Sequence, residues 1–218
     1  MSNPSIAGQA WPIVKPVRPA APVVERVFAA CLAIVCSPVM AAVVLVIGVL
    51  SRRTPLIAHR RVGQHGVEFW MLKIRTMWGP AAPGQTRGLI EYLADSAVPP
   101  LKSSSDPRIT SRFAIFCRRF SLDELPQLLH VVRGQMRLVG PRPITAVEWN
   151  AYYGDSAAAV LSVAPGITGL WQIKGRNRLT YAQRRRLDLF YAGHRSALLD
   201  LMILLQTPLR VLGGRGAC

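Results

Sequence analysis

Acidic residues are scarce in this sequence. Its 218 residues include 11 Asp and Glu against 27 Lys and Arg, which gives a formal net charge of +16 and a pI near 11.1. Half of the residues are nevertheless hydrophobic, and the mean hydropathy of +0.25 is high for a soluble protein. A chain that is both apolar and basic is expected to contact something apolar and something anionic. An anionic bilayer offers both, whereas nucleic acid offers only the anion.

Common metal-binding and catalytic motifs are also missing. The four cysteines (Cys31, Cys36, Cys117 and Cys218) form no Cys-x-x-Cys pair, so neither a zinc site nor a disulfide framework is expected. The sequence has no Gly-x-x-x-x-Gly-Lys-Ser/Thr loop, no His-x-x-x-His pair and no Gly-x-Ser-x-Gly elbow. Their absence argues against a P-loop ATPase, a metalloprotease and a serine hydrolase. No helix-turn-helix or zinc-finger pattern supports a nucleic-acid partner.

A long apolar run is present near the N-terminus. Val27 to Leu50 carries no charge and is long enough to span a bilayer as a helix, but Ser37-Pro38 predicts a sharp kink in it. Basic residues flank both ends, so the positive-inside rule favours both ends in the cytosol. Two alternatives follow: a helix that enters one leaflet and returns, or an ordinary kinked transmembrane helix. The five prolines in residues 1–22 predict an extended tail before it.

The rest of the chain predicts a mostly α fold with a small β-hairpin. Leu56–Arg61 and Val67–Arg75 read as two strands around a turn, and residues 79–107 as a long loop with one short helix near 87–95. The remaining segments show helical spacing: Leu122–Val132, Ile144–Tyr153, a helix from the Thr180–Gln183 capping box to about His194, and the apolar stretch Ala197–Leu212, broken at Thr207-Pro208.

Asp123 and Glu124 are the candidate chemical residues, although they have a plain structural explanation. Ser121 can cap a helix, and acids in the first turn favour the positive end of its dipole. Arginines surround the pair, however, at positions 118, 119, 133 and 137. Arg142, between two prolines, has a restricted backbone, which suits bidentate recognition of phosphate.

Further basic and glycine-rich segments point to the same chemistry. Lys73-Ile74-Arg75 ends the hairpin, and residues 165–172 contain glycines that permit a close backbone approach to a ligand. Asp188 lies in a basic helix and is expected to pair with a neighbouring arginine. Phosphoryl transfer needs such fixed cations around carboxylates, because its transition state spreads negative charge. The alternative is a non-catalytic, membrane-tethered basic scaffold or binding protein, in which the two acids are only helix caps.

From about Glu25 to the C-terminus the sequence resembles the bacterial sugar transferase family, the monotopic polyprenyl-phosphate phosphoglycosyl transferases. The resemblance rests on ordered motifs: 61–63, 73–77, 106–110, 121–128, 138–143, 165–172, 175–176 and 187–188. It implies a disordered N-terminal tail (1–22), a re-entrant membrane helix broken at Ser37-Pro38 (23–51) and a membrane-associated globular catalytic domain (52–218). Because about 22 residues precede the apolar run, the chain resembles the minimal, exopolysaccharide-initiating type.

The resemblance implies transfer of a hexose 1-phosphate from a UDP-sugar to undecaprenyl phosphate, with release of UMP. Asp123 would form a phosphosugar-aspartyl intermediate, and Glu124 and Asp123 would hold Mg²⁺. The implied substrate-binding residues are Lys73, Arg75, Arg118, Arg142, Arg176 and Asp188, of which the three later arginines would hold phosphates.

The resemblance also implies a place for the protein in the cell. It implies the bacterial inner membrane, with the catalytic domain facing the cytosol, lipids as partners and no nucleic acid; a homodimer is left open. Three residues depart from the family pattern, namely His130, Gln135 and Arg137.

Overall fold

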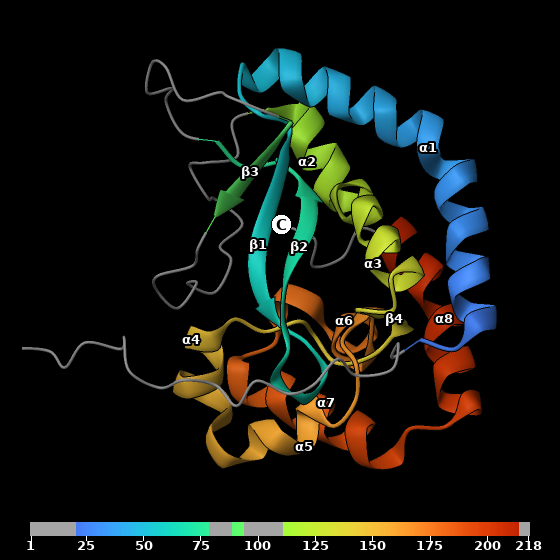
Figure 1. Ribbon diagram of the computed structural model, residues 1–218, viewed down its shortest axis with the longest axis vertical. Helices are drawn as coiled ribbons and strands as arrows, with labels where there is room; N and C mark the ends of the chain where they lie inside the picture. The colour runs from blue at the N-terminus through green and yellow to red at the C-terminus, as the bar shows by residue number, and fades with distance from the viewer. Residues whose placement is uncertain (1–20, 79–88, 94–110, 214–218) are drawn as a thin grey trace, which may run out of the picture.

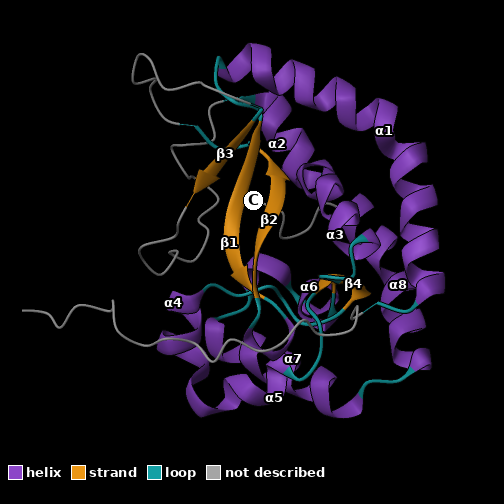
Figure 2. Ribbon diagram, in the orientation of Figure 1, coloured by secondary structure: helices purple, strands orange, loops and turns teal. Residues whose placement is uncertain are grey.

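The computed structural model describes residues 21–78, 89–93 and 111–213. Its elements in chain order are α1 (Val23–Ser51), β1 (Leu56–Val62), η1 (Gln64–Gly66), β2 (Glu68–Ile74), β3 (Ile90–Leu93), α2 (Arg112–Arg119), η2 (Leu122–Gln127), α3 (Leu128–Val132), β4 (Arg137–Val139), α4 (Ala146–Glu148), η3 (Trp149–Tyr153), η4 (Gly154–Ser156), α5 (Ala157–Leu161), β5 (Gly166–Thr168), α6 (Leu170–Lys174), η5 (Arg176–Arg178), α7 (Tyr181–His194) and α8 (Ala197–Leu212). The predicted class, mostly helical with a small sheet, is confirmed (Figures 1 and 2). Most of the predicted tail and of the predicted 79–107 loop lies outside the described residues.

The apolar run forms α1, as predicted. Pro38 lies close to the midpoint of α1 and has no N–H to donate to the carbonyl of Ile34. The Ser37 hydroxyl donates to that carbonyl instead, at 2.7 Å. Figure 1 shows α1 bending near its middle and following the body of the protein, with α2 and α3 between it and the sheet. The Ser-Pro pair therefore bends the helix without leaving the Ile34 carbonyl unsatisfied.

One face of α1 packs on the protein and the other is exposed. Among the described residues, α1 is the one helix long and apolar enough to cross a membrane. Ala29 near its start is buried in a core with β2 and α3. Val43 and Ile47 near its end are buried against β2 and α2. Both halves of the helix therefore rest on the same body of the protein.

The sheet has the order β2-β1-β3. β1 and β2 form the predicted hairpin, with antiparallel pairs from Leu56–Ile74 to Val62–Glu68. β3 adds to the free edge of β1 in parallel. The predicted short helix near 87–95 is therefore wrong at Ile90–Leu93, because pairing with β1 satisfies the backbone of this segment in an extended conformation.

The later helices differ from their predictions in detail. The segment predicted as one helix from Leu122 is a 3₁₀ turn, η2, followed by α3. The helix predicted from Ile144 begins at Ala146, behind a Thr145–Glu148 capping box, and widens into the π turn η3. The capping box that begins α7 is confirmed.

α8 continues past the proline predicted to break it. The helix includes Pro208 and ends at Leu212, so the predicted break at Thr207-Pro208 is wrong. Ile203 is fully buried in a core with β4, α6 and α7. The Thr207 hydroxyl bonds the Ile203 carbonyl at 2.7 Å and the Thr168 hydroxyl of β5 at 2.8 Å. Tertiary packing therefore outweighs the one backbone hydrogen bond that a proline removes.

His130, one of the residues that depart from the family pattern, closes the outer edge of the sheet. Its Nε2 accepts the backbone N–H of Leu72 at 3.0 Å. Nδ1 then carries the proton and donates to Oε1 of Gln135, the second departing residue, at 2.8 Å. Burial lowers the pKa of His130, so the neutral ring has a defined orientation. The two departures form one unit that holds the strand carrying Lys73.

Arg137, the third departure, joins three elements. Arg137 lies in β4. Its Nε donates to Glu25 of α1 at 2.9 Å, and its Nη2 lies 3.5 Å from Asp200 of α8. Glu25 also accepts the backbone N–H of Leu138. Tyr191 donates to the other oxygen of Asp200 at 2.6 Å. This network fixes the start of α1 and the start of α8 against β4.

Candidate active site

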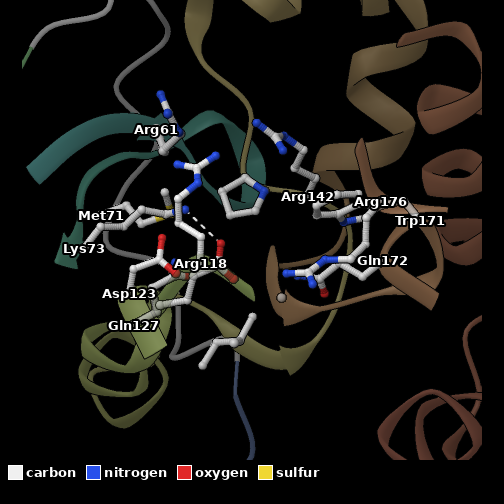
Figure 3. Close-up of a pocket in the computed structure, with 14 residues that line it drawn as sticks. Arg61, Met71, Lys73, Arg118, Asp123, Gln127, Arg142, Trp171, Gln172 and Arg176 are labelled. Atoms are coloured by element: carbon white, nitrogen blue, oxygen red, sulfur yellow. Dashed lines mark hydrogen bonds and ion pairs between the residues drawn. The ribbon is translucent and has the colours of Figure 1, made fainter. Parts of the chain in front are cut away.

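A pocket of about 70 Å³ lies where β2, η2, β5 and α6 meet. Figure 3 shows Lys73, Arg118 and Asp123 on one side of it, and Arg142, Trp171 and Arg176 on the other. Its charged lining residues are Arg61, Lys73, Arg118, Asp123, Glu124, Arg142 and Arg176. Five cations therefore surround two carboxylates. Of the eight predicted site residues, the structure brings six together here; Arg75 and Asp188 do not line the pocket.

The two carboxylates come from η2, a tight turn with a strained entry. Ser121 before it has φ 55°, the left-handed region that side chains other than glycine seldom adopt. The prediction that Ser121 caps the helix is wrong, because its hydroxyl accepts from Nη2 of Arg176 at 2.7 Å and makes no capping bond. Asp123 is buried. Burial, and then the negative charge of Asp123, raise the pKa of Cys117 in α2 to about 11, so the carboxylate lies close to α2.

Lys73 and Glu124 form an ion pair. Lys73 Nζ lies 2.8 Å from Glu124 Oε1, and both side chains are half-buried. β2 aims Lys73 inward because side chains alternate along a strand and directly paired residues share a face. Arg61 pairs with Phe69 across the hairpin, so Arg61, Met71 and Lys73 project from the same face. The hairpin thus delivers two cations to the pocket.

Three arginines bring buried nitrogens without protein partners. Arg118 Nε, Arg142 Nε and Arg176 Nη1 are buried and have no hydrogen-bond partner among the described residues. Leaving such a donor unsatisfied costs about 1–3 kcal/mol, and more for a charged group. Their convergence on one pocket is therefore a site suited to an anion, and phosphate oxygens match the guanidinium fork.

Close backbone packing sets the position of Arg142. A Cβ on Gly140 would lie 2.5 Å from the Ala164 carbonyl oxygen, and one on Gly166 would lie 2.0 Å from the Gly140 nitrogen. A Cβ on Gly169 would lie 2.2 Å from the Gly140 oxygen. The glycines predicted to approach a ligand thus approach the chain itself. They let β4 and β5 pair beside the pocket and fix the Arg142 segment at its edge.

Asp188 supports Arg142 from behind. It is fully buried and accepts the Tyr153 hydroxyl at 2.9 Å and the Arg142 backbone N–H at 3.4 Å. The arginine that donates to Asp188 is therefore Arg142, through its backbone and from another segment, instead of a neighbour in the basic helix as predicted. Burial raises the pKa of Asp188 to about 7. On the other side, the Arg142 guanidinium lies 5.2 Å from the centre of the Trp171 ring, so this buried tryptophan is a platform for the arginine.

Arg75, predicted as a substrate-binding residue, does not line the pocket. β2 ends at Ile74, and the Arg75 N–H bonds the Pro55 carbonyl at 2.7 Å. The strand alternation that aims Lys73 inward therefore stops before Arg75. Its Nε donates to the Thr54 carbonyl at 2.8 Å, and its guanidinium pairs with Glu91 of β3. Arg75 ties the end of α1 to the sheet.

Arg61 and Gln172 are among the lining residues that were not predicted as site residues. Arg61 shares the pocket face with Lys73, and pairing the two predicted strands residue by residue would have revealed it. Gln172 of α6 has a buried Oε1 without a hydrogen-bond donor among the described residues. Both residues lie in motifs of the resemblance, but the place of Gln172 in the pocket depends on how α6 packs against β5.

Comparison with known proteins gives a consistent family. The model of the family described as bacterial sugar transferase matches residues 18–214. The exopolysaccharide production protein ExoY of Sinorhizobium fredii is 42% identical over 166 residues, covering 73% of this chain and 70% of the relative. The UDP-galactose-lipid carrier transferase of Erwinia amylovora is 41% identical over 184 residues, covering 81% and 37%. The undecaprenyl-phosphate galactose phosphotransferase of Salmonella typhimurium is 40% identical over 165 residues, covering 73% and 33%. The chain thus spans most of the first relative and about a third of the other two.

Proposed function

Because this chain belongs to the bacterial sugar transferase family, we propose that it transfers a hexose 1-phosphate from a UDP-sugar to undecaprenyl phosphate. UMP is released, and the product begins an exopolysaccharide. Two of the relatives support this donor and this acceptor by their names: one is a UDP-galactose-lipid carrier transferase and the other an undecaprenyl-phosphate galactose phosphotransferase. The observation that carries the proposal is the pocket, in which unpartnered arginine nitrogens surround two carboxylates.

Asp123 is the nucleophile in this proposal. One of its carboxylate oxygens attacks the β-phosphorus of the UDP-sugar, and the bond from that phosphorus to the bridging oxygen breaks, so UMP leaves with the bridging oxygen. A phosphate oxygen of undecaprenyl phosphate then attacks the phosphorus of the phosphosugar-aspartyl intermediate. Undecaprenyl diphosphate sugar departs and the Asp123 carboxylate is restored. Glu124 is the neighbouring carboxylate, and Lys73 pairs with it.

The arginines stabilise the charge that moves during both steps. Each attack spreads negative charge over the equatorial oxygens of the transferred phosphoryl group. Arg118, Arg142 and Arg176 line the pocket and carry donors that no described residue uses, so they are suited to hold this charge. Lys73 keeps Glu124 in place beside the nucleophile.

The carboxylate pair also fits Mg²⁺. Within the described residues there is no group of three or more His, Cys, Asp or Glu that could hold a metal, and two carboxylates completed by substrate phosphates are a common magnesium ligand set. Asp123 and Glu124 would hold the ion, which when bound neutralises charge on the diphosphate. The adjacent Lys73 limits how much of Glu124 is available to it.

We further propose that α1 is re-entrant and that the pocket opens at the cytosolic face of the inner membrane. At the start of α1, Arg26 Nε donates to the Val132 carbonyl at 2.8 Å, and Glu25 binds β4. At its end, Ile47 packs on Ile74 of β2. Contacts from both ends of the helix to one domain support the placement of both ends on the same side of the bilayer. Its exposed side carries large apolar residues: Val27, Phe28, Ile34, Val35, Leu45 and Val49.

α2 and α8 extend this apolar surface. Ile115 and Phe116 of α2 are exposed, as are Leu201, Leu205 and Leu209 of α8. Apolar patches of this kind mark a membrane or protein contact. The net charge of +16 is suited to an anionic leaflet.

A UMP-release screen tests the function. Membranes containing the full chain, incubated with undecaprenyl phosphate, Mg²⁺ and a panel of UDP-hexoses and UDP-N-acetylhexosamines, should release UMP with at least one donor and form a lipid-linked hexose phosphate. Galactose and glucose are the expected sugars. Release of UDP instead of UMP, or no release with any donor, would contradict the proposal.

Cysteine labelling tests the topology. All four native cysteines (Cys31, Cys36, Cys117 and Cys218) are first replaced by alanine, and single cysteines are then placed at Val24 and Arg52, at the two ends of α1. In right-side-out vesicles a membrane-impermeant maleimide should label neither position until the membrane is opened. Labelling of one end from outside would show a spanning helix.

A further inference from the structure

A second cavity lies behind the first pocket. It measures about 230 Å³ and is enclosed by α1, α3, α6 and α8. Its walls are mainly aliphatic, and they are formed by Leu32, Leu125, Leu128, Leu138, Ile173 and Leu204. Thr207, Arg210 and Val211 of α8 complete one side. We refer to it as the apolar groove.

The apolar groove and the first pocket share a wall. Glu124, Ile167, Gln172 and Arg176 line both. Ser121 also lines the groove and receives a hydrogen bond from Arg176 at 2.7 Å. Ser121 and Arg176 both have positive φ, 55° and 49°, and such strained residues cluster at ligand sites and switch regions. The aliphatic groove therefore ends at the same carboxylate and guanidinium that form one side of the proposed reaction site.

The geometry points to the apolar groove as the binding site for the hydrocarbon chain of the acceptor, with its phosphate at the Glu124–Arg176 wall. This inference rests on the proposed function. An isoprenoid phosphate is a long apolar chain with one anionic end. It matches the groove, which is aliphatic along its length and carries Arg176 at one wall. A phosphate at the wall would meet Arg176 Nη1, which is buried and has no partner among the described residues.

The surroundings of the groove give the chain a route from the bilayer. Leu32 and Leu204 line it and are themselves 36% and 37% exposed. Next to them, Val35 of α1 and Leu205 of α8 are 73% and 66% exposed. A chain leaving the groove between α1 and α8 would therefore meet the apolar surface proposed to lie in the membrane.

The assignment makes α8 a determinant of acceptor selection. The Thr168–Thr207 hydrogen bond holds α8 against β5, and Asp200 fixes its first turn through Tyr191 and Arg137. The donor then reaches Asp123 from the arginine-lined pocket, and the acceptor reaches the same centre from the groove.

Tryptophan substitutions at the groove provide the test. Leu204→Trp on α8 and Leu32→Trp on α1 would narrow the groove, whereas Leu198→Trp and Ile34→Trp add the same bulk at exposed positions of the same helices, 77% and 72% exposed. The full chain in lipid nanodiscs is assayed for a single-turnover burst of UMP from UDP-sugar alone, and for steady-state turnover against undecaprenyl phosphate concentration. We expect the KM for undecaprenyl phosphate to rise about tenfold in the groove variants, equivalent to about 1.4 kcal/mol. The UMP burst should change less than twofold, and the two exposed variants should match the wild type in both assays.

A crosslinking experiment separates this inference from the proposed function. Undecaprenyl phosphate with a diazirine on its first isoprene units should crosslink to α1 or α8 at the groove, and Leu204→Trp should abolish that crosslink. Unmodified undecaprenyl phosphate should compete and phosphatidylglycerol should not. Equal competition by phosphatidylglycerol, crosslinks confined elsewhere, or an equal KM in groove and exposed variants would each overturn the assignment. A wild-type protein that releases no UMP from any donor would contradict the proposed function, while the crosslink would still report on the groove.

Discussion

Arg118 and Arg137 are both buried arginines, but their guanidinium groups meet different partners. Arg137 joins Glu25 and Asp200, so two of its nitrogens face carboxylates from α1 and α8, while its Nη1 is buried without a hydrogen-bond partner among the described residues. Arg118 also has one such nitrogen, its Nε, but this arginine lines the pocket. The two carboxylates make Arg137 a link between elements of the fold. Arg118, at the pocket, is arranged to receive an anion, and stability is lower until the anion binds.

The role given to the pocket arginines depends on a reaction at Asp123. Asp123→Asn keeps the size of the side chain and removes its nucleophilic oxygen. We expect UMP release to fall by about 10³-fold or more, because covalent attack becomes impossible. Release is measured by coupling UMP to a chromogenic or luminescent assay. Activity within tenfold of the wild type would exclude Asp123 as the nucleophile.

Replacing the unpartnered arginine should separate activity from stability. In Arg118→Gln, kcat/KM for the UDP-sugar should fall about 100-fold, because one fixed donor to the transition state is lost. Its thermal unfolding temperature should stay equal or rise, because a buried charge without a complete set of partners has been removed. Arg119→Gln, at the exposed neighbouring position, is the control and should change neither quantity. A marked loss of stability in Arg118→Gln would mean that this arginine is mainly structural.

Replacing the paired arginine should have the reverse effect. Arg137→Gln leaves Glu25 and Asp200 buried without their cation, and breaking such a pair costs about 3 kcal/mol. The free energy of unfolding should fall by that amount, as measured by thermal or chemical denaturation in detergent, while kcat per folded molecule changes little. Arg133→Gln, exposed on the surface, should stay within about 0.5 kcal/mol of the wild type. A loss of activity at unchanged stability would place Arg137 in the reaction instead.

The last prediction concerns Asp188 and the dependence of stability on pH. Burial raises its pKa from 3.8 to about 7, so between these values the folded protein holds a proton that the unfolded chain has released. The free energy of unfolding should therefore decrease as the pH rises from about 4 to about 7 and level off above that. Asp188→Asn cannot ionise and should lose this part of the slope. Denaturation midpoints at one-unit pH intervals measure it, and identical slopes in both proteins would contradict the assignment.

Much of the site could be predicted from the sequence, because several of its residues lie in short motifs whose local structure does not depend on distant contacts. Lys73 and the Asp123–Glu124 pair lie where their motifs predicted. Arg75 does not join Lys73 in the pocket because the strand ends one residue earlier than predicted, and a side chain beyond the last paired residue no longer follows the alternation. Arg61 is predictable from the hairpin, because pairing the two strands residue by residue places it on the face of Lys73.

Other features depend on contacts between distant segments. β3 is a strand because the edge of β1 is available to it, and a short apolar stretch does not record which edge it will meet. α8 continues through Pro208 because β5 and the core hold it. The unpaired nitrogens of Arg118 and Arg142 could not be anticipated, since a sequence gives the number of donors and not which of them remain without acceptors.

The central claim is a covalent bond between Asp123 and the transferred phosphosugar. Purified protein in nanodiscs is mixed with UDP-sugar and Mg²⁺ in the absence of acceptor, quenched, and analysed by peptide mass spectrometry. The account predicts a hexose phosphate adduct on Asp123 that forms together with UMP and disappears when undecaprenyl phosphate is added. UMP and lipid-linked product formed without any adduct, or an adduct on another residue that is competent for transfer, would contradict it.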